Sequence, residues 1–358
     1  MSIDLPISWR QAIDEIAQAG GVCIVLGAVD TGKSTFCSLL ASAAARAGKR
    51  AAVVDADVGQ SDVGPPACVS MGLLTRPIQR LAELSVSALH FVGSTSPPGH
   101  LLPAVVGARL MVEAAQRADA HLVVVDTTGL ITGALARALK TSKIDALHPN
   151  HLVALQRRGE VEHLLAAYTR ARRPAIHRLP VSAHAQVRPR EQRTAARQAA
   201  FERYFQSAVD TELALSEVAI QGSMWRSGQP LPGHMVQYLS DQLGGTVAWA
   251  ERSEEGIFAV VADDCGRVNS GALTQTFPDV SVRLARAQHF DGLLVGVMGR
   301  DDETLGMGIL RHIDFESGRV TLHSPVRADG EIAALRMGSL RLATDYSEVT
   351  HNRPGATG

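Results

Sequence analysis

The sequence predicts an α/β fold in which helices cover both faces of a parallel sheet, followed by a small β-rich domain. Three observations predict this fold. A glycine-rich phosphate-binding pattern lies between a short apolar run and a helical run, and strand-like runs recur after it at the spacing of β-α-β units. Beyond about residue 213, short strand-like runs alternate with glycine and aspartate turns. The expected domains are residues 1–212 and 213–358.

The phosphate-binding pattern is Gly-Ala-Val-Asp-Thr-Gly-Lys-Ser at residues 27–34, a P-loop. An apolar run at 22–26 precedes it, and a helix is expected over 35–48. Backbone N–H groups of such a loop face a bound phosphate, so we expect a sheet of the P-loop NTPase type. Lys33 would contact the β- and γ-phosphates of a nucleoside triphosphate, and the Ser34 hydroxyl would bind Mg²⁺. The predicted nucleotide-binding residues here are Gly27, Asp30, Thr31, Gly32, Lys33, Ser34 and Thr35.

Length and composition limit the class of protein. The 358 residues, 46% of them apolar, suffice for two domains with a sizeable core. Because the formal net charge is −1, a polyanion partner would have to be held by a local basic patch. No C-x-x-C pair occurs, so neither a disulfide framework nor a zinc site is expected from Cys23, Cys37, Cys68 and Cys265. Without a signal-peptide pattern or an apolar run of about 18 residues, we expect a cytoplasmic protein that does not enter a membrane.

A second strand is expected at 51–55, so that residues 22–55 form one right-handed β-α-β unit after a short amphipathic helix at 7–19. This strand leads into Asp55-Ala56-Asp57-Val58-Gly59-Gln60. Side chains two residues apart on a strand point to the same side, so both carboxylates are predicted to face the P-loop. Of Asp55 and Asp57, one would hold Mg²⁺ through water and the other would accept a proton, and the pattern by itself does not say which.

A third strand is expected at 89–93, followed by the polar loop Ser94-Thr95-Ser96-Pro97. In open α/β sheets, ligands bind at the carboxyl ends of the strands. The three hydroxyl residues of this loop, Ser94, Thr95 and Ser96, are therefore candidates for contact with a substrate, and so is Asp30 of the P-loop.

The strongest strand pattern in the chain, residues 121–126, follows a helix expected over 101–118. It ends in Asp126, directly before Thr127-Thr128-Gly129. An apolar strand that ends in aspartate and accompanies a P-loop is typical of the magnesium side of P-loop proteins.

Residues 141–145, Thr-Ser-Lys-Ile-Asp, approximate a guanine-reading pattern, but serine replaces its first residue and a helical run precedes it instead of a strand. We therefore do not expect guanine recognition there. A better strand candidate is 151–156, followed by a helix over 160–168. Gln156, the last residue of this expected strand, is predicted to bind the nucleotide.

Nine arginines and only two acidic residues fall between Arg170 and Arg203. Arg193 and Arg197 are four residues apart on an expected helix, so their guanidinium groups share one face. Guanidinium forks suit phosphate groups, and the imbalance of charge in an otherwise neutral chain favours phosphate binding over a merely solvated helix.

The C-terminal domain shows no catalytic constellation. Trp225 and Trp249 are expected to be core residues and not platforms for stacking bases. The expected strands include 256–261, 292–297, 306–310 and 319–322.

Five features occur in a fixed order: the P-loop, Asp-x-Asp-x-Gly-Gln, Gly-Ser-Thr-Ser-Pro, Asp-Thr-Thr-Gly and the arginine run. Together they resemble the Clp1/Grc3 family of polynucleotide 5′-hydroxyl kinases. The resemblance covers roughly residues 20–345 and is strongest to the short archaeal-type members. It implies an enzyme that transfers the γ-phosphate of ATP, with Mg²⁺, to the 5′-hydroxyl end of RNA or DNA. The partner would be nucleic acid. The sequence does not say which proteins, if any, bind this chain, and it does not choose between RNA and DNA.

The resemblance also implies roles for individual residues. Asp57 would activate the hydroxyl with Gln60 beside it, which makes Asp55 the first choice for the water-mediated contact with Mg²⁺ and the second choice for the base. Leu130 stands where eukaryotic members have a tryptophan after the clasp. The clasp residues that bind substrate would be Thr127, Thr128 and Gly129. An arginine-rich lid over about 170–205 would close on the ATP phosphates through Arg188 and Arg193, and Arg197 also matches a family arginine. The expected catalytic residues are Lys33, Asp57, Arg188 and Arg193.

Three other functions compete with the kinase. A nucleotide-dependent switch or transport ATPase needs neither the Asp-x-Asp pair nor the lid. A small-molecule kinase would phosphorylate a free nucleoside. A non-catalytic scaffold in RNA processing would retain ATP without turnover.

Overall fold

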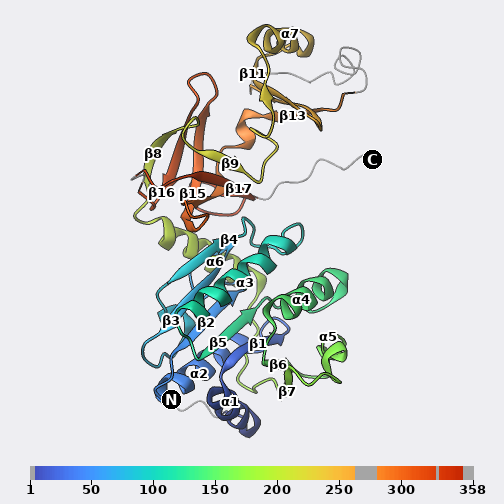
Figure 1. Ribbon diagram of the computed structural model, residues 1–358, viewed down its shortest axis with the longest axis vertical. Helices are drawn as coiled ribbons and strands as arrows, with labels where there is room; N and C mark the ends of the chain where they lie inside the picture. The colour runs from blue at the N-terminus through green and yellow to red at the C-terminus, as the bar shows by residue number, and fades with distance from the viewer. Residues whose placement is uncertain (1–4, 263–279, 328–329, 350–358) are drawn as a thin grey trace. The chain divides into compact units, whose positions relative to one another are not determined.

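The computed structural model describes residues 5–262, 280–327 and 330–349 (Figure 1). Cys265 lies outside the described residues, and the other three cysteines are buried free thiols. The chain divides into two compact units, Met1–Arg203 and Tyr204–Gly358. In the part of the chain that the structure describes, no helix is both long enough and apolar enough to cross a bilayer.

The first unit is built on a seven-stranded sheet in the order β4-β3-β2-β5-β1-β6-β7. Strands β2, β5, β1, β6 and β7 are parallel, which confirms the expected P-loop α/β sheet. The strands are β1 (Gly21–Gly27), β2 (Ala51–Ala56), β3 (Cys68–Leu74), β4 (Ala88–Phe91), β5 (Leu122–Thr127), β6 (His151–Gln156) and β7 (Ala175–Pro180).

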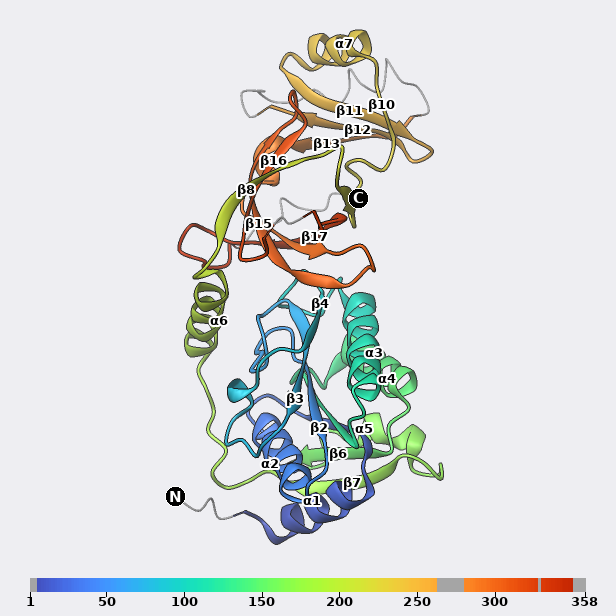
Figure 2. The same ribbon diagram turned by 60° about the vertical axis from the view of Figure 1, so that its left-hand side comes forward.

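Helices cover both faces of this sheet. Figure 2 shows α1 (Ile7–Ala19) and α2 (Lys33–Arg46) on one face, and α3 (Leu101–Arg117) and α4 (Gly133–Leu147) on the other. Successive residues of β1 enter two different cores: Ile24 packs on the α3 side, and Cys23 and Val25 pack on the α2 side. A strand buried on both faces reads as a continuous apolar run, which is why the sequence predicts it well.

Two strands, β3 and β7, are absent from the sequence prediction, and β3 makes the sheet mixed. It pairs antiparallel with both β2 and β4. The chain between Ala56 and Cys68 forms no helix. A strand that returns without a crossover must run antiparallel. As a result β4 again runs parallel to β2, and the two strands end at the same edge of the sheet.

Two further expectations change in detail. The helix expected over 160–168 is a short α5 (Glu162–Leu165) followed by the 3₁₀ turn Ala166–Tyr168. The guanine-like residues 141–145 lie inside α4 and not at the end of a strand.

The second unit contains two sheets, as the β-rich pattern predicts. The six-stranded sheet has the order β8-β16-β15-β14-β17-β9, and the four-stranded sheet the order β10-β11-β12-β13. Trp225 is buried, while Trp249 is half-buried beneath the guanidinium of Arg226. Helix α6 (Arg190–Phe205) spans the division between the units. The remaining elements are β8 (Val209–Ala214), β9 (Ala219–Gln221), β10 (Gln229–Pro230), α7 (Gly233–Leu243), β11 (Val247–Ser253), β12 (Gly256–Val261), β13 (Val282–Arg286), β14 (Leu293–Met298), β15 (Thr304–Asp314), β16 (Arg319–Ser324) and β17 (Ala334–Arg341).

Candidate active site

A cleft of about 710 Å³ lies at the carboxyl edge of the seven-stranded sheet, in the first unit. Loops from distant parts of the chain line it: the P-loop, the loop after β2, the loop after β4, the clasp after β5 and the segment before α6. All of these loops were predicted from the sequence as parts of the site. Strand order brings them together, because parallel strands place their carboxyl ends at one edge.

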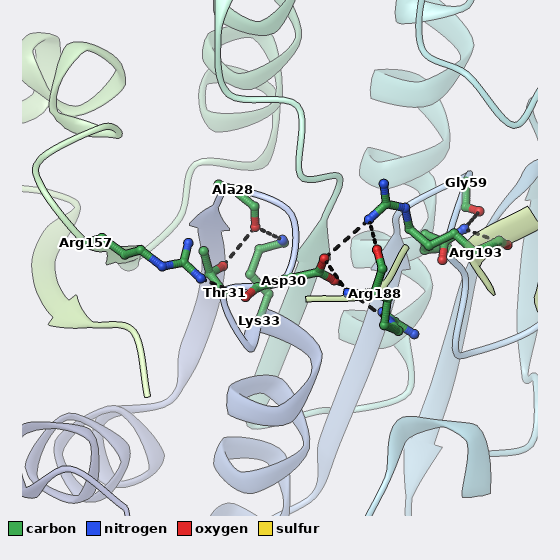
Figure 3. Close-up of polar contacts among 9 residues, drawn as sticks. Ala28, Asp30, Thr31, Lys33, Gly59, Arg157, Arg188 and Arg193 are labelled. Carbon is green, nitrogen blue, oxygen red and sulfur yellow. Dashed lines mark hydrogen bonds and ion pairs between the residues drawn. The ribbon is translucent and has the colours of Figure 1, made fainter. Parts of the chain in front are cut away.

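The P-loop has the tight geometry that phosphate binding requires. Gly32 has φ of +85°, and a Cβ at Gly27 would lie 2.6 Å from Thr31 Oγ1, so both positions favour glycine. Lys33 Nζ donates to the carbonyl oxygen of Ala28 at 2.8 Å, and Thr31 Oγ1 donates to the same oxygen at 2.9 Å (Figure 3). The lysine therefore lies within its own loop, beside the space for the phosphates.

Ser34 lies against the aspartate at the end of β5. Its hydroxyl donates to Asp126 Oδ2 at 2.6 Å, while the N–H of Thr127 donates to Asp126 Oδ1 at 2.8 Å. Burial raises the pKa of Asp126 to about 6, although Lys33 and the Ser34 hydrogen bond act in the opposite direction. One hydroxyl and one carboxylate beside a triphosphate site suit Mg²⁺, which takes few protein oxygens and completes its shell with phosphates and water.

The structure separates the two carboxylates that were expected to share one side. Asp55 is only 1% exposed and does not line the cleft. Its Oδ1 accepts from the N–H of Asp57, and its Oδ2 accepts from the N–H groups of Asp62 and Val63 and from the Ser61 hydroxyl. The alternation fails because β2 ends at Ala56, before Asp57. Asp55 thus organises the loop and does not contact Ser34, whose hydroxyl donates to Asp126.

Asp57 does line the cleft. Its Oδ1 accepts from the N–H groups of Gly59 and Gln60, both at 3.1 Å. A Cβ at Gly59 would lie 2.7 Å from the carbonyl oxygen of Thr95, so glycine lets this loop approach the loop after β4. The close approach places Thr95 and Gln60 in the same cleft wall as Asp57.

The two predicted lid arginines converge on the P-loop residue Asp30 (Figure 3). Arg193 Nη1 lies 3.3 Å from Asp30 Oδ2, and Arg188 Nε lies 3.7 Å from Oδ1. The backbone N–H of Arg188 also donates to Asp30 Oδ2 at 3.0 Å. Arg157 approaches from the other side and donates to the carbonyl oxygen of Asp30 at 3.2 Å. Arg188, Arg193 and Arg197 all line the cleft.

The clasp packs directly on the P-loop. A Cβ at Gly129 would lie 2.4 Å from Val29 Cγ2 and 2.7 Å from the Val29 nitrogen, so these backbones touch. Thr128, Gly129 and Leu130 line the cleft. Thr127 does not line it; its hydroxyl donates to the carbonyl oxygen of Val25 at 2.8 Å and joins β5 to β1.

Some predicted site residues lie outside the cleft wall. Gln156 Nε2 donates to Glu162 Oε1 at 2.6 Å, and Ser94 forms a local turn with Ser96. Gly27 and Thr31 act within the P-loop. The predicted residues that do not line the cleft are Gly27, Thr31, Asp55, Ser94, Ser96, Thr127 and Gln156.

Sequence reasoning missed two charged residues of the cleft, Asp62 and Arg80. Burial raises the pKa of Asp62, while a hydrogen bond from the Ser34 hydroxyl and the charge of Arg188 lower it. The Asp62 carboxylate therefore lies beside Ser34. Arg80 lies in the segment after β3. Two hydroxyls of α2 hold this segment in place: Ser38 donates to the carbonyl oxygen of Gln79 and Ser42 to that of Ile78. The only sequence signal for Asp62 is its place two residues after Gln60.

The cleft residues fall almost entirely inside a known family pattern. The family described as mRNA cleavage and polyadenylation factor CLP1 P-loop matches residues 27–207, from the first P-loop glycine to the end of α6. The chain belongs to the Clp1 P-loop family. The resemblance expected from the motifs alone is thereby confirmed.

Similar proteins share nearly the whole length of this Clp1-family chain. A polyribonucleotide 5′-hydroxyl-kinase of Thermococcus kodakarensis is 32% identical over 97% of this chain and 95% of that protein. One of Methanocaldococcus jannaschii is 28% identical over 91% of this chain and 88% of that protein. Among solved structures, the wild-type Clp1p–Pcf11p complex matches with a TM-score of 0.59 at 12% identity, covering 92% of this chain and 77% of that chain. At that identity the structural match shows the fold alone.

Proposed function

We propose that this protein is an ATP-dependent polynucleotide 5′-hydroxyl kinase that phosphorylates the 5′ ends of RNA. One observation carries the proposal: a P-loop, a cleft-facing aspartate and two lid arginines line a single cleft. RNA is the favoured polynucleotide because the archaeal relatives are named polyribonucleotide kinases. The cytoplasmic location expected from the sequence stays a prediction.

Phosphoryl transfer depends on placing the reactants and neutralising charge. The P-loop would hold ATP, with Lys33 at the β- and γ-phosphates. Ser34 and Asp126 would hold Mg²⁺, which supplies positive charge to the phosphate oxygens when bound. Asp62 lies near enough to Ser34 to join this set of oxygens.

Asp57 would accept the proton of the attacking 5′-hydroxyl. Its backbone hydrogen bonds all go to Oδ1, which orients the carboxylate at the cleft wall. A general base fixed in this way contributes roughly 10²–10⁴ in rate. Arg188 and Arg193 would exchange their contacts with Asp30 for contacts with the transferred phosphoryl group.

The proposal is tested with purified protein, γ-labelled ATP and oligonucleotides that carry a 5′-hydroxyl. Label should appear at the 5′ end of RNA and should not appear on an otherwise identical oligonucleotide that already carries a 5′-phosphate. A panel of RNA and DNA, single- and double-stranded, would define the substrate. Absence of label on every member of the panel would refute the kinase function, and labelling of free nucleosides would indicate a small-molecule kinase.

A further inference from the structure

Helix α4 carries two lysines into the interior of the first unit, beneath the catalytic edge. Lys140 is 0% exposed and Lys143 is 1% exposed. The chain contains only four lysines against 31 arginines. A compact ammonium differs from a guanidinium fork in size and hydrogen-bond geometry. Two of the four lysines therefore occupy interior positions of a chain that otherwise uses arginine for nearly all its positive charge.

Lys140 contacts the clasp. Its Nζ donates to the carbonyl oxygen of Thr128 at 2.6 Å and to Thr128 Oγ1 at 3.2 Å. Because the lysine nitrogen is the donor in this contact, Thr128 Oγ1 acts as its acceptor. The hydrogen of the Thr128 hydroxyl is then left to donate elsewhere. Because Thr128 lines the cleft, the hydroxyl is available to donate to an oxygen bound there.

Lys143 contacts the base of the Asp57 loop. Its Nζ donates to the carbonyl oxygen of Ala56 at 3.2 Å. Ala56 is the last residue of β2 and precedes Asp57 directly. The hydrogen bond therefore restrains the peptide group between Ala56 and Asp57, and with it the position of the Asp57 side chain.

Burying these groups is costly. Burial lowers the pKa of Lys143 to about 8 and the pKa of Lys140 well below its ordinary value, while Asp57 and Asp126 act in the opposite direction. Apolar side chains of similar volume often stabilise a protein more than buried charges do. Two buried groups that cost stability, one in contact with the clasp and the other with the Asp57 loop, are better explained by their effect on the site than by their effect on folding.

We propose that Lys140 and Lys143 are positioning residues for the acceptor side of the kinase site. Lys140 sets the Thr128 hydroxyl as a donor toward an anionic oxygen of the polynucleotide, and Lys143 holds Asp57 at the attacking hydroxyl. This inference rests on the proposed kinase function, and it assigns the two lysines separate kinetic effects.

The Lys140 part is tested by a double-mutant cycle of Lys140→Met and Thr128→Val. Each single variant should raise the KM for a 5′-hydroxyl oligonucleotide about tenfold, the effect of losing a hydrogen bond to a charged group, and should leave the KM for ATP unchanged. Because Lys140 acts through Thr128, the double variant should also show about a tenfold effect. Independent effects that multiply to about a hundredfold would overturn the proposal.

The Lys143 part is tested by Lys143→Met. Its kcat should fall about 10- to 100-fold with both KM values unchanged, because the displaced base is needed only for the chemical step. Lys49→Met is the matched control, since Lys49 Nζ also donates to backbone carbonyls, those of Ala17 and Gln18, but does not line the cleft. Its kinetic constants should match those of the unchanged protein.

Thermal unfolding separates positioning from a structural role. The Met variants should unfold within a few degrees of the unchanged protein while their kinetic constants differ. Kinetic constants within twofold of the unchanged protein would show that the lysines only fill the interior. If a Met variant does not fold, the Leu variant at the same position, which also lacks a donor, takes its place in the same comparison. Failure of the unchanged protein to phosphorylate any 5′-hydroxyl would refute the proposed function itself, a different result from active protein with unaffected variants.

Discussion

The proposed donor and acceptor sides of the cleft are built in different ways. The donor side is mostly one contiguous segment, the P-loop with Lys33 and Ser34, completed by Asp126 from the neighbouring strand. The acceptor side combines the loop of Asp57, the loop of Thr95, and Thr128 of the clasp, which are held together by close backbone approaches and buried lysines. We therefore expect the donor side to tolerate change elsewhere in the fold better than the acceptor side, which combines segments that are distant in the chain.

The largest effect should come from breaking the donor side. Lys33→Ala removes the cation at the β- and γ-phosphates, so transfer should fall below detection and ATP affinity should weaken. Labelled-ATP transfer and a direct ATP-binding measurement check both effects. Lys49→Ala serves as the control, and appreciable transfer by Lys33→Ala would contradict the assigned role of the P-loop lysine.

Removing the base should affect only the acceptor side. Asp57→Asn should lower kcat by roughly 10²–10⁴, the usual contribution of a general base, and should leave ATP affinity near that of the unchanged protein. Steady-state kinetics together with ATP titration separate the two quantities. Near-normal turnover in this variant would show that the carboxylate of Asp57 does not accept the proton.

The contact between the two sides can be tested at Gly129. The added methyl of Gly129→Ala would meet the backbone of Val29, so the clasp and the P-loop must move apart. Both KM values should rise several-fold, and kcat should fall about tenfold, since small misplacements in a site are costly. Gly233→Ala is the control, because a Cβ there meets nothing within 4 Å. An effect on one KM alone would mean that the two sides move independently.

The smallest effect is expected at the outer cleft. Arg80→Ala should raise the KM for the oligonucleotide a few-fold with kcat unchanged, because the exposed guanidinium would contact a backbone phosphate. Loss of one such contact should reduce the slope of log affinity against log salt by about 0.7 for a single strand. Arg76→Ala, in the same segment but outside the cleft wall, should change neither quantity.

Sequence reasoning succeeds where the chemistry is local. The P-loop lies in one segment of eight residues, and the strands that surround it are buried on both faces, so their apolar runs are unmistakable. Asp57, Thr128 and the lid arginines were found because each follows a predicted strand or lies in an unusual run of charge. Such signals are carried by residues that are neighbours in the sequence.

Sequence reasoning fails where the role of a residue depends on which distant segment of the chain packs against it. Asp55 and Asp57 look equivalent in the chain, and only the end of β2 at Ala56 turns one into a loop organiser and leaves the other in the cleft. Arg80 has no motif, and its place follows from β3, an antiparallel strand that the apolar pattern did not reveal.

The sequence by itself determined that a P-loop lies on a parallel sheet and which family the chain resembles, because those signals depend on neighbours along the chain. Only the tertiary structure decided that Asp126 and not Asp55 accepts from Ser34, that Arg188 and Arg193 contact Asp30, and that Lys140 and Lys143 lie against the clasp and the Asp57 loop. Those facts depend on strand order and helix packing, which bring together residues far apart in the sequence.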